Sequence, residues 1–584
     1  MEKYPLFLDF DSTDSRLSDI NLGLSASKLS FPPKQGRFTM KKRVKGTLLL
    51  FIAAVMLIVT TAGCAKGNDP VVEKEPASTN GPEATKENTQ GESTYPISGG
   101  AKLKYWLPLA ANTSANFKNL AETEFAKELQ ARTGVEIEFI HPAAGTENEQ
   151  FNLMIASGNL PDIIWYNWAA YPGGPDKAIS DGVIAKLNDL QSENAPNLSQ
   201  YLQANPDIDR MVKTDNGSYY SLPFIRGDQK LLVSAGPVIR KDWLDDLGLE
   251  VPATMDEWHT MLTTFKEAKG ADTPFSPYWN MQSVLSWGTF VGAYGITKGF
   301  YTDEGQVKYG PVEPGYKDFL TTMNQWFSEK LLDNNFATLD TKTVDANIMN
   351  GKSGATVASA GSGVAKWTTT MEDIDSNFQV VGAPYPVLNK GDQPQFGQYS
   401  LPFTGFGAAI SANSKNKEVA VKVLDYLYSE EGMRLANFGV EDTSYTLEDG
   451  KAVFTDLILE NPNKWPISQA MAQYTLSHDM GPFVQNPDIM QTMIPVQGEA
   501  VVTWSNTAAE KHFLPPVFVT EEQQGEMAKI MNEVTTYENE MLLKFIMGTE
   551  SIDNFDKYVE QMKKMGIEKA IGMQQEALER YNNR

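Results

Sequence analysis

Aromatic rings with an amide between them are the residues of this chain that most clearly could do chemistry. Tyr166, Asn167 and Trp168 follow the short apolar run of residues 163–165, so they stand where a buried strand ends. Ring faces contact the C–H surfaces of a sugar and an amide bonds its hydroxyls, so this triplet suits a polyhydroxylated ligand. A ring-rich strand end is more often core or rim than ligand contact, and this alternative stays open.

Two stretches of the sequence resemble catalytic motifs, and each lacks a residue that the motif requires. Residues 350–353 (Asn-Gly-Lys-Ser) resemble a phosphate-binding loop, but Ala346 stands where the motif needs glycine, and Asp345 would oppose a phosphate. Residues 360–363 lack the glycine that a nucleophile elbow needs two positions before its serine. The four histidines lie far apart, which argues against a zinc site: His141, His259, His478 and His512. Two catalytic carboxylates need only be close in space, so a glycoside hydrolase stays an alternative.

The elements that must position the Tyr166 triplet alternate between strand and helix. Residues 102–108 and 135–139 are expected strands, and apolar residues at helical spacing follow each of them. Gly134 and Gly158 stand where the two helices are expected to end. This strand–helix–strand–helix–strand order indicates a parallel sheet with right-handed crossovers. In such sheets ligands bind at the carboxyl ends of the strands, which is where the triplet lies.

The N-terminal part of the chain indicates export and a lipid anchor. Basic residues 41–45 precede an apolar run at 48–59, which is shorter than the roughly 20 residues of a membrane-spanning helix and fits a signal peptide. Residues 61–64 (Thr-Ala-Gly-Cys) resemble a bacterial lipobox, although Leu is usual where Thr61 stands. We expect Cys64 to carry the lipid, residues 40–63 to be the signal peptide, and residues 1–39 to be an extension upstream of the true start.

Composition agrees with an exported protein. Cys64 is the only cysteine among 584 residues, so no disulfide can form. Residues 64–100 hold few apolar side chains and are expected to be a flexible tether. The net charge is −24, and without residues 1–63 it becomes −28, because 41 Lys and Arg remain against 69 Asp and Glu. A body this acidic should repel nucleic acid and anionic lipid.

Several stretches, in this order and spacing, resemble the extracellular solute-binding proteins of ABC importers, in their family 1, LipO-like branch. Residues 237–257 look like the segment by which these proteins cross from their first lobe to their second. The likeness extends over residues 102–581 and includes three further motifs: Gly407-Ala408-Ala409-Ile410-Ser411, Asn437-Phe438-Gly439-Val440-Glu441 and Leu514-Pro515-Pro516.

The resemblance implies an α/β fold of the two-lobed, type II periplasmic-binding-protein kind, with a hinged cleft that shuts on ligand. Chain order then assigns residues 101–235 and 385–428 to lobe one, and residues 236–384 and 429–584 to lobe two. The resemblance also implies a protein without catalytic activity that hands an extracellular solute to an ABC permease. No cofactor is expected, and the protein is expected to be a monomer.

The resemblance places further rings and amides on the cleft, where we expect them to bind substrate beside the Tyr166 triplet: Trp279, Asn280, Trp287, Trp367, Tyr399 and Trp504. Arg226 precedes the crossing and is expected to bind a hydroxyl or a carboxylate of the ligand, with a hinge salt bridge as the alternative. This set favours an oligosaccharide as the ligand. A peptide ligand, and a role in adhesion or signalling, stay open.

Some relatives carry a calcium loop of alternating Asp and Asn after the helix that here ends near Phe265. Residues 266–272 are too short for that loop and include Lys266 and Lys269, so no calcium is expected there. The anchor and tether suit a cell without a retaining outer membrane, which favours a Gram-positive host.

Overall fold

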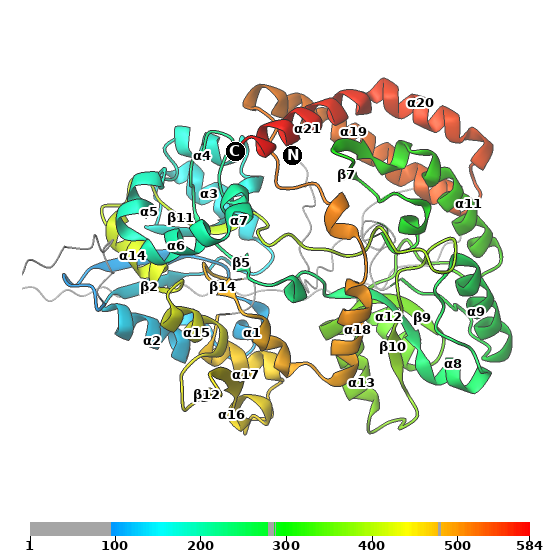
Figure 1. Ribbon diagram of the computed structural model, residues 1–584, viewed down its shortest axis with the longest axis horizontal. Helices are drawn as coiled ribbons and strands as arrows, with labels where there is room; N and C mark the ends of the chain where they lie inside the picture. Colours follow the sequence, from blue (N-terminus) through cyan, green and yellow to red (C-terminus); the bar gives the residue numbers. More distant parts are fainter. Residues whose placement is uncertain (1–94, 278–284, 286–287, 477–479) are drawn as a thin grey trace, which may run out of the picture. The chain divides into compact units, whose positions relative to one another are not determined.

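The structure is a computed structural model that describes residues 95–277, 285, 288–476 and 480–584 (Figure 1). All of these residues belong to one compact unit. Within them, no helix is long and apolar enough to cross a bilayer. The predicted upstream extension, signal peptide, lipidated Cys64 and most of the tether lie outside the described residues and stay predictions.

Lobe one is built on a five-stranded sheet in the order β2-β1-β3-β11-β4. Strand β1 (Lys102–Trp106) pairs in parallel with both β2 (Glu136–Ile140) and β3 (Ile163–Asn167), as the sequence predicts. Strand β11 (Phe406–Ile410), which comes much later in the chain, pairs antiparallel with β3 and with β4 (Leu222–Pro223). The sheet is therefore mixed, and β3 is covered on both edges.

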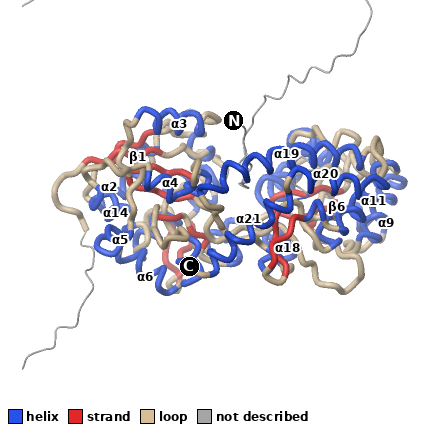
Figure 2. Tube along the Cα trace, turned by 90° about the horizontal axis from the view of Figure 1, so that it is seen from above, coloured by secondary structure: helices blue, strands red, loops and turns tan. Residues whose placement is uncertain are grey.

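Side-chain patterning explains these strands and the helices between them. Leu103 and Tyr105 of β1 are buried while the lysines beside them are exposed, which is the alternation of a strand with one covered face. Helices α2 (Glu124–Thr133) and α3 (Glu147–Ser157) end at Gly134 and Gly158, whose φ angles of 72° and 67° lie in the left-handed region. In Figure 2 the first sheet runs between α3 on one side and α2 and α14 (Lys417–Tyr426) on the other.

Lobe two is built on a three-stranded antiparallel sheet in the order β10-β6-β9. The central strand β6 (Ala235–Arg240) is buried along its whole length, between β9 (Ala355–Ser359) and β10 (Val380–Gly382). Lobe two also contains nine of the described helices, which pack on this sheet or on one another: α8 (Lys241–Leu247), α9 (Met255–Ala268), α11 (Pro314–Ser328), α12 (Thr341–Met349), α13 (Lys366–Met371), α18 (Pro495–Ser505), α19 (Glu521–Ile546), α20 (Phe555–Met565) and α21 (Ile567–Asn582).

The packing differs from the predicted lobe boundaries at two places. Helix α15 (Glu430–Phe438) buries Leu435 and Ala436 in the core of lobe one and packs against α2, although the prediction gave residues 429–584 to lobe two. Tyr385 and Phe396 instead pack in the cores around the second sheet, although the prediction gave them to lobe one. The reason for the first difference is that the chain stays on lobe one for three more helices after α14: α15, α16 (Asp456–Leu459) and α17 (Ile467–Tyr474). We therefore propose residues 95–226 and 406–485 for lobe one, and 235–397 and 495–584 for lobe two.

Three segments connect the lobes in this division: residues 227–234, 398–405 and 486–494. The first two are bonded to each other. The side-chain oxygen of Gln398 accepts hydrogen bonds from the backbone N–H groups of Ser234 (2.6 Å) and Ala235 (3.2 Å). The N–H of Ser400 donates to the carbonyl of Leu232 at 2.8 Å. Two of the connections thus behave as one hydrogen-bonded ribbon.

Candidate functional site

The carboxyl end of β3 places Tyr166 and Asn167 at the edge of the sheet, beside the connecting segment 398–405. Asn167 pairs with Phe406 of β11 and is 8% exposed. Its side-chain oxygen is buried and accepts no hydrogen bond from the residues that the structure describes. Gly405 has φ of 93°, and a Cβ there would lie 2.5 Å from that oxygen. The glycine therefore lets the backbone pass directly against a buried, unbonded amide.

Tyr166 presents its edge rather than its faces. Its ring stacks on Phe151 of α3, with the centroids 3.6 Å apart and the planes 4° from parallel. The hydroxyl donates to the side-chain oxygen of Asn148 at 3.3 Å, and burial raises the pKa of Tyr166. The hydroxyl therefore stays protonated at neutral pH and can donate to, or accept from, a ligand.

Trp168 is a core residue, which corrects the prediction that it contacts ligand. Its side chain is 0% exposed. The indole N–H donates to the carbonyl of Gly407 at 3.2 Å, and the backbone N–H donates to the carbonyl of Gly405 at 3.1 Å. Phe151, Tyr166 and Tyr171 surround the ring. Trp168 thus bonds β11 through its indole and the connecting segment through its backbone.

The connecting segment also brings Arg226 to this edge. Arg226 lies in β5 (Ile225–Arg226), which pairs in parallel with β14 (Val484–Gln485), and its backbone N–H donates to the carbonyl of Pro402 at 2.9 Å. The guanidinium carbon lies 5.4 Å from the centre of the Phe224 ring. Arg226 is partly exposed, and its backbone bond to Pro402 places it beside the connecting segment that carries Tyr399.

Tyr399 lies on the connecting segment 398–405, and its ring pairs with that of Phe513, which was not among the predicted ligand contacts. Its centroid is 5.5 Å from that of Phe513, at 56° between the planes. Phe513 is 38% exposed, which is high for an aromatic side chain. Burial, and then the carboxylate of Glu510, raise the pKa of the Tyr399 hydroxyl. One feature of the sequence could have indicated Phe513 as a site residue. It directly precedes Leu514-Pro515-Pro516, one of the motifs on which the resemblance rests.

Two more predicted ligand contacts are buried tryptophans of lobe two, and this is a second correction. Trp367 and Trp504 are each 0% exposed. The Trp367 indole N–H donates to a side-chain oxygen of Asp345 at 2.7 Å, and that of Trp504 donates to the carbonyl of Pro237 at 3.0 Å. Both indoles anchor core strands and helices. Trp279, Asn280 and Trp287 lie outside the described residues and stay predictions.

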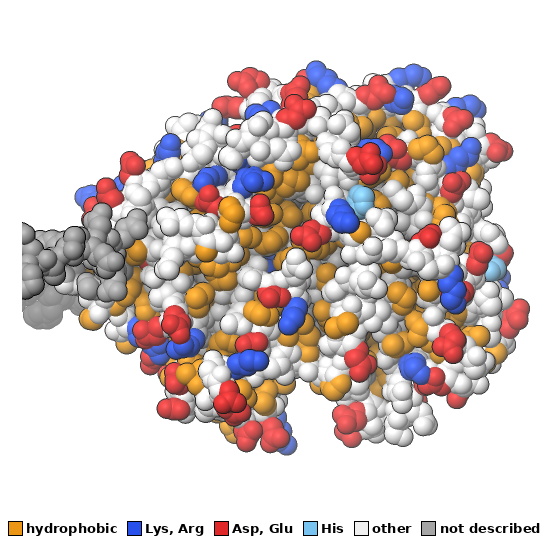
Figure 3. Space-filling model, in the orientation of Figure 1, with side chains coloured by type: hydrophobic (Ala, Val, Ile, Leu, Met, Phe, Trp, Pro, Cys, Tyr) orange, Lys and Arg blue, Asp and Glu red, His pale blue; other side chains and the backbone are white. Residues whose placement is uncertain are grey.

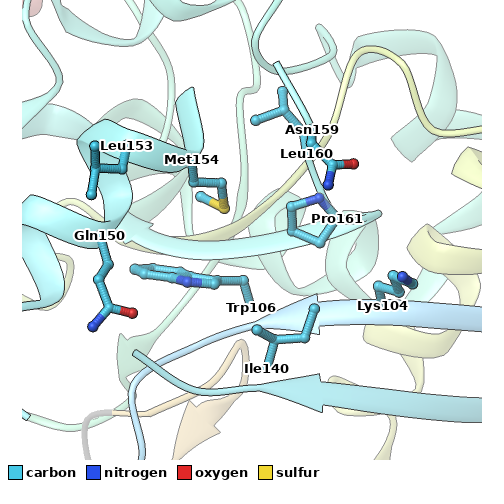
Figure 4. Close-up of a pocket in the computed structure, with 9 residues that line it drawn as sticks. All are labelled: Lys104, Trp106, Ile140, Gln150, Leu153, Met154, Asn159, Leu160 and Pro161. Carbon is cyan, nitrogen blue, oxygen red and sulfur yellow. The ribbon is translucent and has the colours of Figure 1, made fainter. Parts of the chain in front are cut away.

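A separate cavity of about 390 Å³ lies on lobe one beside α3 (Figure 4). In the figure Met154 and Leu153 lie above the Trp106 indole, with Pro161 beside them and Gln150 and Lys104 toward the two ends of the cavity. The cavity contains none of the predicted site residues. It lies on the flank of α3, so it is distinct from the edge that Tyr166 and Asn167 form.

The residues after α9 do not fit a calcium ion. The ammonium of Lys266 donates to the carbonyl of Glu329 at 2.6 Å, and that of Lys269 pairs with the carboxylate of Asp246 at 2.7 Å. A calcium ion needs six or more oxygen ligands, and two ammonium groups at this turn would repel it. Among the described residues, no group of three or more His, Cys, Asp or Glu side chains could hold a metal ion.

The fold and sequence have relatives among transport proteins. A family model described as bacterial extracellular solute-binding protein matches residues 83–434. The chain is 25% identical to lipoprotein LipO of Bacillus subtilis over 483 residues, which cover 80% of this chain and 89% of that protein. It is 23% identical to the fructooligosaccharide ABC transporter substrate-binding protein FusA of Streptococcus pneumoniae over 519 residues, covering 84% and 92%. The crystal structure of the alginate-binding protein AlgQ2 is similar, with a TM-score of 0.66 and 26% identity, over 84% of this chain and 100% of that one.

Proposed function

The chain belongs to the bacterial extracellular solute-binding proteins, and from this premise we propose that it captures an oligosaccharide outside the cell and delivers it to an ABC permease. The observation that carries the choice of ligand is the ring pair of Tyr399 and Phe513, in which Phe513 is 38% exposed and Tyr399 adds a hydroxyl. Exposed ring faces contact the C–H surfaces of a sugar, and a hydroxyl bonds its hydroxyls. FusA and AlgQ2 are named for binding fructooligosaccharide and alginate, which supports the same class of ligand.

The site we propose consists of the carboxyl end of β3, the connecting segment 398–405 and the ring pair of Tyr399 and Phe513. Asn167 and the Tyr166 hydroxyl would bond sugar hydroxyls, Tyr399 and Phe513 would contact ring faces, and Arg226 would bond a hydroxyl or a carboxylate. Trp279, Asn280 and Trp287 would add to it. Closure of the lobes on the sugar would follow from better binding in the closed arrangement.

We propose further that the protein has no catalytic activity. Support comes from residues 350–353, which resemble a phosphate-binding loop in sequence but serve a structural role. Ser353 is fully buried, and its hydroxyl donates to the carbonyl of Thr273 at 2.6 Å and bonds the hydroxyl of Ser276 at 2.7 Å. This serine is therefore part of a buried hydrogen-bond network in lobe two. Its hydroxyl is committed to that network rather than to a phosphate or a metal ion.

The location we propose is the outer face of the cell membrane of a Gram-positive bacterium, with Cys64 carrying the lipid and the tether giving the body reach. The name of the LipO relative supports a lipoprotein. Nucleic acid is not a proposed partner. On the face drawn in Figure 3, Lys and Arg side chains are scattered among Asp and Glu rather than gathered in one patch. We propose a monomer.

The test is a thermal-shift series with neutral fructooligosaccharides, acidic uronate oligosaccharides and short peptides. A ligand at 100 times its dissociation constant adds about 2.7 kcal/mol to the free energy of unfolding, which raises the melting temperature measurably. We expect one sugar class to do this and to be recovered intact by chromatography. A shift with peptides alone would contradict the choice of ligand, and recovery of cleaved sugar would contradict the absence of catalysis.

A further inference from the structure

Two arginines at the end of α21 bind one aspartate of lobe one. The Nε of Arg580 lies 2.9 Å from one carboxylate oxygen of Asp215, and the Nη2 of Arg584 lies 2.6 Å from the other. Asp215 follows α7 (Pro206–Met211), and its side chain is 19% exposed. Charge-assisted hydrogen bonds from guanidinium to carboxylate are among the strongest in proteins, and two on one carboxylate fix its orientation. We call Asp215, Arg580 and Arg584 the α21 latch.

The aspartate is held in place by its own lobe. On either side of it, the hydroxyl of Thr214 donates to Asp176 at 2.9 Å and the amide of Asn216 donates to Asp176 at 2.8 Å. Asp176 lies in α4 (Gly174–Ser180). The turn that carries Asp215 is therefore bonded to a helix of lobe one on both sides. Because the turn is already ordered, the arginines lose little conformational entropy of the turn when they bind Asp215, and the contact is stronger for it.

Arg584 bonds both lobes at once. Its side chain is 1% exposed. Its Nη1 donates to the carbonyl of Lys213 at 2.7 Å and to that of Arg210 at 3.3 Å, both in lobe one. Its Nη2 also lies 3.4 Å from the carbonyl of Pro516, and its guanidinium carbon lies 4.7 Å from the centre of the Tyr581 ring. A buried guanidinium with this many acceptors is a fixed connection rather than a surface ion pair.

Arg580 and Arg584 lie at the end of a helix that packs in lobe two. Ile567, Ala570 and Met573 of α21 are buried in a core of lobe two, and Arg580 also donates to the carbonyl of Phe518 at 2.7 Å. In Figure 1 the red end of α21 reaches the helix α7 from which Asp215 follows. The latch thus joins two parts of the chain that have different cores and that three connecting segments also join.

We propose that the α21 latch is a non-covalent fourth connection between the lobes that holds them in the arrangement of this structure. A rotation of one lobe against the other that moves α21 relative to the turn at Asp215 breaks or distorts these bonds. The latch therefore sets how readily the lobes rearrange. This inference concerns the protein without ligand and does not depend on the identity of the solute.

The test measures the distance between the lobes by electron spin resonance of paired spin labels. The whole chain carries Cys64→Ser, which removes the only native cysteine, and Glu193→Cys in lobe one with Glu267→Cys in lobe two. Both label positions are exposed and lie in α5 (Asn188–Asn194) and α9. We expect one distance for the chain with an intact latch. With Asp215→Asn we expect a second distance, whose population relative to the first rises about tenfold, because a charged hydrogen-bond pair is lost.

The matched control is Glu526→Gln, which removes the exposed ion pair between Glu526 and Lys569 within lobe two. It should leave the distance distribution unchanged. The inference is overturned if Asp215→Asn leaves the distribution unchanged, or if Glu526→Gln alters it equally. Circular dichroism confirms folding of each variant, and Arg580→Gln replaces Asp215→Asn if that variant does not fold. Because no sugar is added, the outcome is independent of the proposed function.

Discussion

Phe513 is the exposed ring through which lobe two would reach a sugar. It is 38% exposed, and its contact with Tyr399 leaves part of the ring open to solvent. We predict that Phe513→Ala raises the dissociation constant for the sugar about tenfold, because one stacking face worth about 1–1.5 kcal/mol is lost. Isothermal titration calorimetry with the sugar found by thermal shift measures this.

The control for Phe513 is Met547→Ala. Met547 is exposed to nearly the same degree, 40%, but it lies at the end of α19. We expect no change in affinity for that variant and similar melting temperatures for both. Equal affinities for Phe513→Ala and the unaltered protein would remove Phe513 from the site.

Asp425 is a buried carboxyl that makes stability depend on pH. It accepts hydrogen bonds from the N–H of Leu198 at 2.9 Å and the amide of Asn197 at 2.8 Å, at the start of α6 (Pro196–Ala204). Burial raises the pKa of Asp425 to about 6. The folded state therefore binds this proton more tightly than the unfolded state, whose pKa is about 3.9. Its contribution to stability is full below about pH 4 and is lost as pH rises through about 6.

Asp425→Asn should remove that dependence. We predict that the difference in unfolding free energy between the variant and the unaltered protein moves in favour of the variant by up to about 3 kcal/mol between pH 4 and pH 7. Urea unfolding at several pH values measures it. A difference that stays constant over this range would contradict the raised pKa.

The burial of three tryptophans shows which residue-scale features the sequence could predict. The sequence predicts Trp168, Trp367 and Trp504 as ligand contacts, but all three are buried. Whether the ring faces solvent depends on residues distant in sequence, such as Gly407 beside Trp168 and Pro237 beside Trp504. Phe513 was missed for the same reason, since its partner Tyr399 lies more than a hundred positions away.

At the scale of elements, the connecting segment 398–405 is what assembles the site. Gly405 is its closest approach to β3, and we predict that Gly405→Ala destabilises the protein by about 2–4 kcal/mol. The left-handed φ of 93° costs about 1 kcal/mol for alanine, and the contact at 2.5 Å with the amide of Asn167 adds overpacking. Denaturant unfolding measures the loss.

Gly391→Ala isolates the contact from the backbone strain. Gly391 has a φ of 98°, and a Cβ there would meet nothing within 4 Å. We expect that variant to lose only about 1 kcal/mol, the cost of a left-handed backbone at alanine. Equal losses for the two variants would mean that the segment yields at Gly405 and does not press on Asn167.

Local patterning predicted the first strands and helices of lobe one but could not predict β11. The alternation at residues 136–139 and the glycines at 134 and 158 act within one element and are visible in sequence. Pairing of β11 with β3 depends on two runs some 240 positions apart, and nothing local distinguishes an antiparallel neighbour from a parallel one. The predicted lobe boundaries differ from the packing for a related reason. Chain order assigned α15 to lobe two, but the helix packs in the core of lobe one.

At the scale of the whole molecule, the chain joins a proposed lipid anchor, a tether and a two-lobed body. The body is acidic and has no disulfide, so its stability depends on the cores of the two lobes. Three covalent connections and the α21 latch link these cores. A solute that binds at the β3 edge contacts one of the connections directly, which is how binding would bias the arrangement of the lobes.

The most direct test of this account is hydrogen–deuterium exchange with and without the sugar identified by thermal shift. We predict that saturating sugar slows exchange at residues 163–171 and 398–407, where the β3 edge meets the connecting segment. Protection confined to α3 and residues 159–161 would place the sugar in the separate cavity beside Trp106 and would contradict the proposed site. Unchanged exchange throughout lobe one would contradict it as well.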